Sequence, residues 1–344
     1  MKVKNRHLFF TLAVVAGVFL AVFDHGRTRW ERHAPEGAFV RPLKIESGST
    51  VKRVGRQLVE GGWAKGELDW RLYCALNPCD GIKAGSYEFA DREGLKTVVE
   101  SLRKGKVATR KVTIPEGRAS WEIFSILKRH YPELDSLRWE KLVHDPAFAA
   151  TLGVQANSLE GWLLPDTYPL PAVADEAQLL KYLVQSFENV WKSLPVEDSP
   201  VHRRYGKLGV LTLASIVEEE AATPGERGHI AGVFWNRLQR NISLGADPTV
   251  RFIFRSLSGP IYQSQLDSDS PYNTRKFRGL PPGPISNPGR DALLAALHPD
   301  RTDDIFFVAK DDGSREHFFA PTLAKHNEYR QVAARNRAKA GRTD

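Results

Sequence analysis

Residues 208–238 read LGVLTLASIVEEEAATPGERGHIAGVFWNRL. The stretch predicts two helices separated at Thr223-Pro224, because Thr223 is a favoured N-cap residue and Pro224 fits the first position of the second helix. A strongly apolar first helix is expected to begin at Lys207. Glu226 lies three residues after Thr223, which is the spacing of a capping box, so a helix cap is one interpretation of this carboxylate.

The first of these helices ends in three consecutive glutamates, Glu218, Glu219 and Glu220. At about 100° per residue the three side chains point in different directions. We expect Glu218 and Glu220 to face apolar or small residues and Glu219 to lie nearest Ser215 and water. Burial raises the pKa of a carboxyl group, as a general acid at neutral pH requires. The alternative is a solvated acidic helix end without a chemical role.

Length and composition bound the class of protein. The chain has 344 residues, 42% of them hydrophobic and 26% charged, which is typical of a globular protein with two folded domains. Its formal charge of +8 favours anionic surroundings such as phospholipid headgroups, wall polymers or nucleic acid. The charge alone does not choose among them.

The N-terminus carries an uncharged run from Leu8 to Phe23, preceded by Lys2, Lys4 and Arg6. This pattern predicts a cytoplasmic tip and a single transmembrane anchor over residues 1–23, with the N-terminus inside. The run is short for a bilayer, so a cleaved signal peptide is the alternative, but no small-x-small cleavage site follows it. Either way, residues 24 onward are expected outside the cytoplasm. We therefore expect a single-pass protein of the cell inner (cytoplasmic) membrane with a periplasmic or extracytoplasmic catalytic domain.

The remaining sequence predicts an α+β fold in two parts. After a solvated linker over residues 24–38, a small α+β module is expected over 39–106. Its elements are a strand at 39–45, helices near 51–59 and 69–76, a strand at 83–89 and a helix at 95–102. A larger mixed α/β region spans 107–335, with a strand in KVTIPEG at 111–117 and helices near 121–127 and 179–187. Residues 336–344 are expected to fray.

Two cysteines, Cys74 and Cys79, form a single Cys-x4-Cys pair. No further cysteine or local histidine completes a zinc ligand set. In an oxidising compartment the pair could form a disulfide, and two unrelated free thiols are the alternative. Both interpretations are structural.

A set of motifs in fixed order resembles the YceG-like family of endolytic murein transglycosylases, also called MltG. The motifs are TIPEG (113–117), LEGWLLPDTYPL (159–170), LASIVEEEA with ER, VFWNRL and ADPTV (213–250), SPYNTR (270–275), GLPPGPISNPG (279–289), ALHP (296–299), and HFF with HN (317–327). The resemblance implies a transglycosylase catalytic region over 107–335 and a LysM-like, glycan-binding module over 39–106. It implies no cofactor and no metal.

The resemblance also implies the site and its chemistry. The family's catalytic glutamate is the first acid after the SIV-type segment, which is Glu218, and an acid in a supporting role falls on Glu220. One glutamate suffices for a lytic transglycosylase that cuts the MurNAc-GlcNAc β-1,4 bond of nascent strands and leaves 1,6-anhydro-MurNAc ends, terminating glycan elongation. Candidate substrate-binding residues, each with a turn or capping role as the alternative, are Asn236, Asp247, Thr249, Tyr272, Asn273 and Thr274.

Three aromatic residues, Trp162, Tyr168 and Trp235, could stack on sugar rings, although packing in a core is the more frequent role. The expected partners are peptidoglycan glycan strands, the cytoplasmic membrane and peptidoglycan synthases. A non-catalytic wall-binding scaffold is one rival class. A nucleic-acid binder is the other, and the chain lacks the basic recognition helix or interleaved aromatic and basic residues which that class requires.

Overall fold

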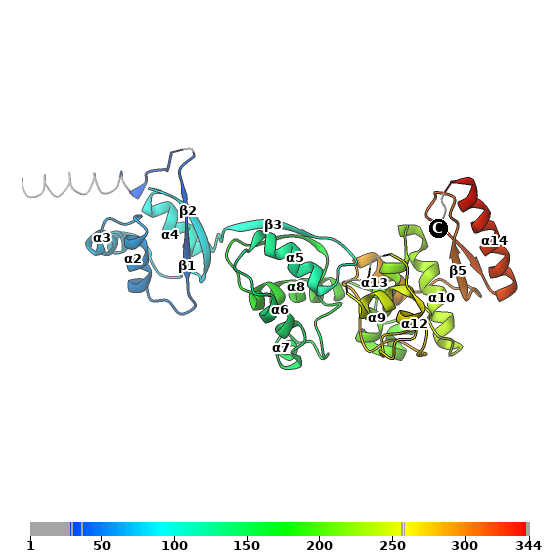
Figure 1. Cartoon of the computed structure of the whole chain (residues 1–344). Coiled ribbons are helices and arrows are strands. Elements are labelled where there is room, and N and C mark those ends of the chain that lie inside the picture. Colours follow the sequence, from blue (N-terminus) through cyan, green and yellow to red (C-terminus); the bar gives the residue numbers. More distant parts are fainter. Residues whose placement is uncertain (1–27, 29, 36, 256, 258, 342–344) are drawn as a thin grey trace, which may run out of the picture. The chain divides into compact units, whose positions relative to one another are not determined.

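The structure is a computed structural model that describes residues 28, 30–35, 37–255, 257 and 259–341. The chain divides into two compact units (Figure 1). Unit 1 runs to Arg110 and also includes Pro169–Ala174, and unit 2 comprises Lys111–Tyr168 and the chain from Asp175. The expected boundary after residue 106 lies close to this division. The predicted anchor over residues 1–23 lies outside the described residues, and no helix in the described part is long and apolar enough to cross a bilayer.

Unit 1 has the predicted order of elements. Strand β1 (Val40–Ile45) pairs antiparallel with β2 (Gly85–Ala90), and the connection between them holds α2 (Val51–Glu60) and α3 (Glu67–Leu76). Helix α4 (Leu95–Lys104) follows β2. The Thr50 hydroxyl accepts a hydrogen bond from the Arg53 N–H and so caps α2.

A continuous apolar core supports unit 1, with Val54, Leu58, Tyr87, Val98 and Leu102 fully buried at its centre. Alternate residues of β1 and one face each of α2 and α4 supply it, as their sequence periods predict. Of the two alternatives for the cysteines, the structure has the disulfide between Cys74 and Cys79, with 5.4 Å between their Cα atoms.

The expected solvated linker over 24–38 is wrong at Trp30. The Trp30 indole is buried in the core of unit 1, its ring centroid lies 5.3 Å from that of Tyr73, and its Nε1 donates to Asp69. Arg32 donates to the Arg92 carbonyl nearby. A lone tryptophan has no apolar period to reveal it, but it buries enough area to hold the segment on the module.

Unit 2 is mostly helical and carries the rest of the elements. Its first part holds α5 (Ser120–His130), α6 (Ser136–Val143), α7 (Pro146–Thr151) and α8 (Glu176–Trp191). Its second part holds α9 (Pro200–Glu220), η1 (Pro224–Glu226), α10 (Arg227–Gln239), α11 (Asp247–Ile253), α12 (Gln263–Leu266), α13 (Arg290–Leu297), β5 (Phe306–Ala309), β6 (His317–Ala320) and α14 (Leu323–Lys339). Strand β3 (Thr109–Ile114) pairs with β4 (Asp166–Pro171), and β5 pairs antiparallel with β6.

Helix α9 is the centre of unit 2, because every residue from Gly209 to Val217 is buried and the helix packs against α10, α11 and α13. Gly206 interrupts it with a left-handed φ of 66°, so the apolar part begins at Lys207 as predicted. The predicted break between α9 and α10 is also present. Glu226 occupies the N-cap position of α10, but its side chain caps no backbone N–H of the helix. Its carboxylate accepts hydrogen bonds from Thr223 Oγ1 (3.1 Å), His317 N (2.7 Å) and His317 Nδ1 (3.0 Å).

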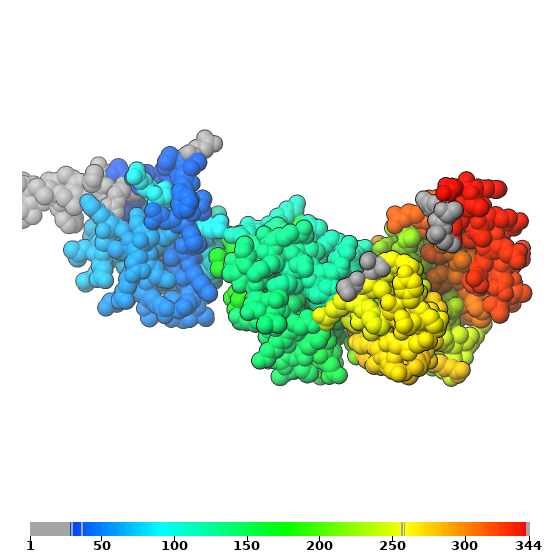
Figure 2. All heavy atoms as spheres, viewed as in Figure 1, coloured from blue at the N-terminus to red at the C-terminus, as the bar shows by residue number. Residues whose placement is uncertain are grey.

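Several elements differ from the prediction. Helices α6 and α7 and strands β4, β5 and β6 were not predicted, because each is too short for its apolar residues to establish a period. The expected frayed tail over 336–344 is wrong in its first residues. Helix α14 continues to Lys339, since Asn336 donates to the Lys310 carbonyl and Arg337 pairs with Asp311. Figure 2 shows the segment over residues 259–275, in yellow, at the surface of unit 2.

Candidate active site

The Glu218 side chain lies at the end of α9 and is only 5% exposed. Its Oε1 accepts a hydrogen bond from Arg227 Nη2 at 2.7 Å, and its Oε2 accepts one from the Gly289 N–H at 2.9 Å. The expected apolar surroundings of Glu218 are therefore wrong. The break after α9 turns the chain back, so that Arg227, the first residue of α10, reaches the end of the preceding helix.

Arg227 also pairs with Glu116, whose Oε2 lies 3.2 Å from the same Nη2 atom. Burial, and then the charge of Glu218, raise the pKa of Glu116, while Arg227 opposes them. Gly289 makes the cluster possible, since a Cβ at this position would lie 2.0 Å from Glu116 Oε1. Two carboxyl groups thus share one guanidinium, so Arg227 has a second anionic partner beside each of them.

A buried carboxyl group, Glu160, ties three segments together beside this cluster. It accepts hydrogen bonds from Ser120 N (3.0 Å), Ser120 Oγ (2.8 Å) and Asn287 Nδ2 (2.7 Å). Asn287 in turn donates to the Arg118 carbonyl and accepts from Leu163 N. Burial raises the pKa of Glu160 to about 7, against the hydrogen bonds from Ser120 and Asn287. The network fixes the segments that carry Glu116 and Gly289.

Glu219 is exposed, as predicted, and lines a pocket of about 350 Å³. Burial of its carboxyl end nevertheless raises its pKa to about 7, with a hydrogen bond from Ser286 acting against this and the charges of Glu122 and Glu218 adding to it. Gly117 has a φ of +74° and approaches closely, since a Cβ there would lie 2.7 Å from Glu219 Oε1. The pocket is lined by Gly117, Ala119, Trp121, Glu122, Glu219, Pro248, Arg251, Phe252, Arg255, Leu257 and Ile285.

Glu220 is half-buried and makes different contacts from Glu218 and Glu219. It accepts a hydrogen bond from the Asp247 N–H at the start of α11. Burial raises its pKa to about 7, the charge of Asp247 adds to this, and Arg237 and Arg275 oppose it. The three consecutive glutamates therefore have three separate environments, as helix geometry predicts.

The structure places three of the six predicted substrate-binding residues inside the fold. Thr249, Asn273 and Thr274 are buried, and the hydroxyls of the two threonines lie 2.9 Å apart. Asn273 donates to the carbonyls of Leu266 and Ser268, which closes the SPYNTR loop. These side chains hold the loops in place, and their hydrogen-bonding groups are satisfied internally.

The other three candidates are partly accessible. Asp247 pairs with Arg275, whose Nε lies 2.7 Å from Asp247 Oδ1. The ring of Tyr272 packs on that of Phe252, with centroids 5.0 Å apart, behind the glutamate pocket. Asn236 donates its amide protons to the carbonyls of Thr302 (2.7 Å) and Asp304 (2.9 Å). Asp247 and Tyr272 therefore contact groups beside the glutamates, whereas Asn236 does not.

Among the predicted aromatic residues, Trp162 and Tyr168 are buried in the core, so they do not present a ring to substrate. Trp235 is half-buried and lines a different cavity. Trp121, which sequence reasoning assigned only to a helix, lines the glutamate pocket instead. Its ring packs 5.3 Å from Phe252, and the Arg255 guanidinium lies 4.5 Å from its centre.

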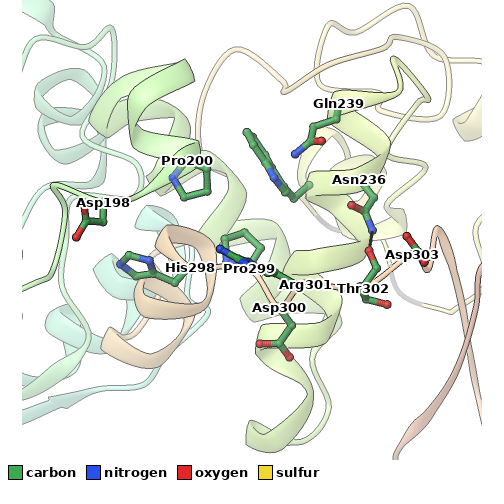
Figure 3. A pocket seen from close by; sticks show the side chains of 11 residues that line it. Asp198, Pro200, Asn236, Gln239, His298, Pro299, Asp300, Arg301, Thr302 and Asp303 are labelled. Carbon is green, nitrogen blue, oxygen red and sulfur yellow. Dashed lines mark hydrogen bonds between the residues drawn. The ribbon is translucent and has the colours of Figure 1, made fainter.

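The cavity lined by Trp235 is larger, at about 680 Å³, but holds none of the glutamates (Figure 3). Figure 3 shows Asn236 and Thr302 joined by a hydrogen bond on one side and Asp198 and His298 on the other. No residue lining it has a resolved pKa shift. We assign the active site to the smaller pocket and the adjoining Glu218 cluster, because carboxyl groups with raised pKa values gather there.

Sequence reasoning did not assign roles to Glu116, Glu160, Arg227 and Asn287. Each lies in a motif that was recognised, respectively TIPEG, LEGW, ER and ISNPG. The motifs therefore indicated the residues that form the site. They did not indicate which of these residues contact one another, since Glu116 and Asn287 lie far apart in the sequence.

Carboxyl groups gathered at a helix end, several of them with raised pKa values, beside a pocket with an accessible aromatic ring, define a site for acid–base chemistry on a polar substrate. Residues 43–332 match the YceG-like family, and the chain belongs to that family. The architecture agrees: a crystal structure of a YceG-like protein from Listeria monocytogenes, 30% identical, has a TM-score of 0.57 and covers 85% of this chain and 99% of its own.

Two curated relatives carry a descriptive name. The chain is 29% identical to the endolytic murein transglycosylase of Bacillus subtilis, over 92% of this chain and 90% of the relative. It is 28% identical to the enzyme of the same name from Streptococcus pneumoniae, over 77% of this chain. The match spans about half, 53%, of the pneumococcal protein.

Proposed function

We propose that the protein is an endolytic lytic transglycosylase that cleaves the MurNAc-GlcNAc β-1,4 bond of nascent peptidoglycan strands and leaves 1,6-anhydro-MurNAc ends. Such cleavage terminates the elongation of a glycan strand. Family membership and the name of the relatives support the substrate class. The observation that carries the proposal is the convergence of three motif-bearing segments on the Glu218 carboxyl group at the end of α9.

Glu218 acts first as the general acid. Arg227 moves its pairing toward Glu116, so that the Glu218 carboxyl can hold a proton without leaving a guanidinium unpaired. The proton passes to the glycosidic oxygen as the bond to the anomeric carbon of MurNAc breaks, and the GlcNAc hydroxyl leaves. The acetamido group of the substrate assists at the anomeric carbon.

Glu218 then acts as the general base. Its carboxylate takes the proton from the C6 hydroxyl of the same MurNAc, and the C6 oxygen bonds to the anomeric carbon to close the 1,6-anhydro ring. The proton returns to Glu218, so water is not consumed and no cofactor is required. Arg227 and the Gly289 N–H are in place to stabilise the carboxylate form between the two steps.

The neighbouring residues bind and position the strand. The ring of Trp121, with Phe252 behind it, offers a surface for a sugar ring beside the glutamates. Glu220 holds the start of α11 and thereby Asp247, which remains a candidate for substrate binding with Tyr272. The buried Glu160 network keeps the Glu116 and Gly289 segments together.

We further propose that the chain is a single-pass protein of the cytoplasmic membrane with residues from 24 onward outside the cytoplasm. The apolar run from Leu8 to Phe23 with its basic flank supports this. A disulfide between Cys74 and Cys79 fits an oxidising compartment. Unit 1, with its β1-α2-α3-β2 order, is proposed to bind glycan as a LysM-like module, and peptidoglycan synthases remain candidate partners.

Digestion of purified glycan strands tests the activity. Mass spectrometry of the products should show 1,6-anhydro ends, internal cleavage and no requirement for added metal. The rival scaffold function predicts strand binding without products. Strands recovered intact, or products with ordinary reducing ends, would contradict the proposal.

A further inference from the structure

Helix α3 of unit 1 carries apolar residues on its exposed side. Leu68, Leu72 and Leu76 follow at intervals of four residues, and their exposures are 79%, 41% and 52%. At about 100° per residue these leucines form a stripe on a different side of α3 from Trp70 and Tyr73, which enter the core. Three adjacent leucines in water on one helix face are unusual for a soluble module and mark an interaction surface.

A groove with three basic residues lies on another side of the same helix. A groove of about 550 Å³ between α2 and α3 is lined by Lys52, Arg56 and Arg71, with Glu67 as its one acid. Within the described residues, none of these three cations forms an ion pair. Arg71 directly precedes Leu72, so the cationic groove and the leucine stripe share α3. The combination of apolar residues with unpaired basic ones is typical of a helix that lies in the interface of an anionic bilayer.

The length of the chain brings this helix near the membrane. Trp30 lies seven residues after Phe23, the last residue of the apolar run. A fully extended chain of that length spans at most about 25 Å. Trp30 is not free to move away from the module, because it packs on Tyr73 and donates to Asp69, both on α3. The anchor is therefore tied directly to the helix that carries the leucine stripe.

We propose that the leucine stripe of α3 docks into the outer surface of the cytoplasmic membrane, with Lys52, Arg56 and Arg71 among anionic phospholipid headgroups. The inference rests on the proposed membrane anchor and adds a second, interfacial contact. Leu68, Leu72 and Leu76 enter the headgroup and acyl boundary, which removes their side chains from water. Docking holds unit 1 against the bilayer.

The test uses the full chain reconstituted in vesicles. Leu72→Cys labelled with the environment-sensitive dye NBD reports the stripe, because both native cysteines are paired with each other. Leu137→Cys on α6 is the matched control, since Leu137 is 81% exposed but lies in unit 2. In vesicles that contain phosphatidylglycerol, we expect blue-shifted emission at position 72 that spin-labelled lipid quenches. At position 137 we expect emission as in water.

The cations give a second measurement. Each basic residue at an anionic surface contributes about fivefold to binding, so the triple variant Lys52→Gln/Arg56→Gln/Arg71→Gln should shift the docking equilibrium by about 100-fold. Replacing the anionic vesicles with neutral phosphatidylcholine vesicles should weaken docking of the unmodified chain by a similar factor. The exposed positions of all three residues leave folding unaffected.

Three outcomes separate the possibilities. Equal, water-like emission at positions 72 and 137 overturns the proposal. A blue shift at position 72 that lipid-borne quenchers do not reach also overturns it, because a protein surface would then cover the stripe. Retention of the protein on floated vesicles after a carbonate wash tests the anchor separately, so lipid quenching without retention would refute the anchor and support docking.

Discussion

Replacing Glu218 with glutamine is expected to lower the release of 1,6-anhydro ends by about 10²-fold or more, because glutamine cannot donate or take up the proton. A loss of that size corresponds to about 2.7 kcal/mol in the activation free energy. The substitution also has a structural cost. Both carboxylate oxygens of Glu218 accept from N–H donors, Arg227 and Gly289, whereas glutamine offers a single acceptor.

One of the two hydrogen bonds must therefore be lost, at a cost of about 1.5–3 kcal/mol in stability for a bond to a charged group. Arg227 keeps Glu116 as a partner, which limits the cost. Because the catalytic and structural effects are similar in size, turnover and stability must both be measured. We would measure anhydro products by mass spectrometry from pH 5 to 9, and melting temperature and strand binding on the same preparation.

The matched controls are the two neighbouring glutamates. Glu219→Gln should do little to turnover, and Glu220→Gln should act mainly through stability, since its carboxyl accepts from the Asp247 N–H. Glu219 is the other candidate for the catalytic acid, because it lines the pocket and burial raises its pKa to about 7. Wild-type product release by Glu218→Gln, with a folded Glu219→Gln or Glu220→Gln variant inactive, would refute the assignment.

Three further predictions concern the surroundings of the site and the module. Burial raises the pKa of Glu160 from 4.5 to about 7, so its contribution to stability is fully present below about pH 4.5 and is lost as the pH rises through 7. In Glu160→Gln the difference in unfolding free energy between pH 5 and pH 8, measured by denaturant melts, should shrink by up to about 3 kcal/mol, and an unchanged difference would argue against this burial effect. Glu116→Gln leaves Arg227 paired with Glu218 alone, so Arg227 holds the Glu218 carboxylate more firmly and turnover should fall; unchanged release of anhydro ends would dismiss a role for Glu116 in the reaction. A chain that starts at Val107 should bind long strands more weakly than the complete extracytoplasmic part in co-sedimentation, and equal binding would rule out a glycan-binding role for the module.

Much of the fold could be predicted where apolar residues recur with a clear period. The helix from Lys207, the break at Thr223-Pro224 and the strand and helix order of unit 1 are of this kind. The pattern was insufficient for β5 and β6, which have four residues each. Trp30 was missed for a related reason, since a single residue carries no period although it enters the core.

The site was only partly predictable, because helix geometry separates neighbouring side chains but does not say what they meet. Helix geometry separated Glu218, Glu219 and Glu220 correctly. The partner of Glu218 is an arginine that returns across a helix break, and its second donor is a backbone N–H from Gly289. Such partners depend on loop paths. Thr249 and Thr274 show the converse, since hydroxyls that looked available for substrate bond to each other.

The division between the two units has a consequence for how the protein can be rearranged. The chain passes between them three times, at Arg110/Lys111, Tyr168/Pro169 and Ala174/Asp175. Unit 1 is therefore not a separable N-terminal cassette, because a short piece of it is encoded well inside the catalytic region. A chimera that takes its first 110 residues from a relative would keep this chain's own Pro169–Ala174 segment. That segment would then have to pack on a unit 1 from another protein. We expect viable exchanges, in evolution or in the laboratory, to change both segments together.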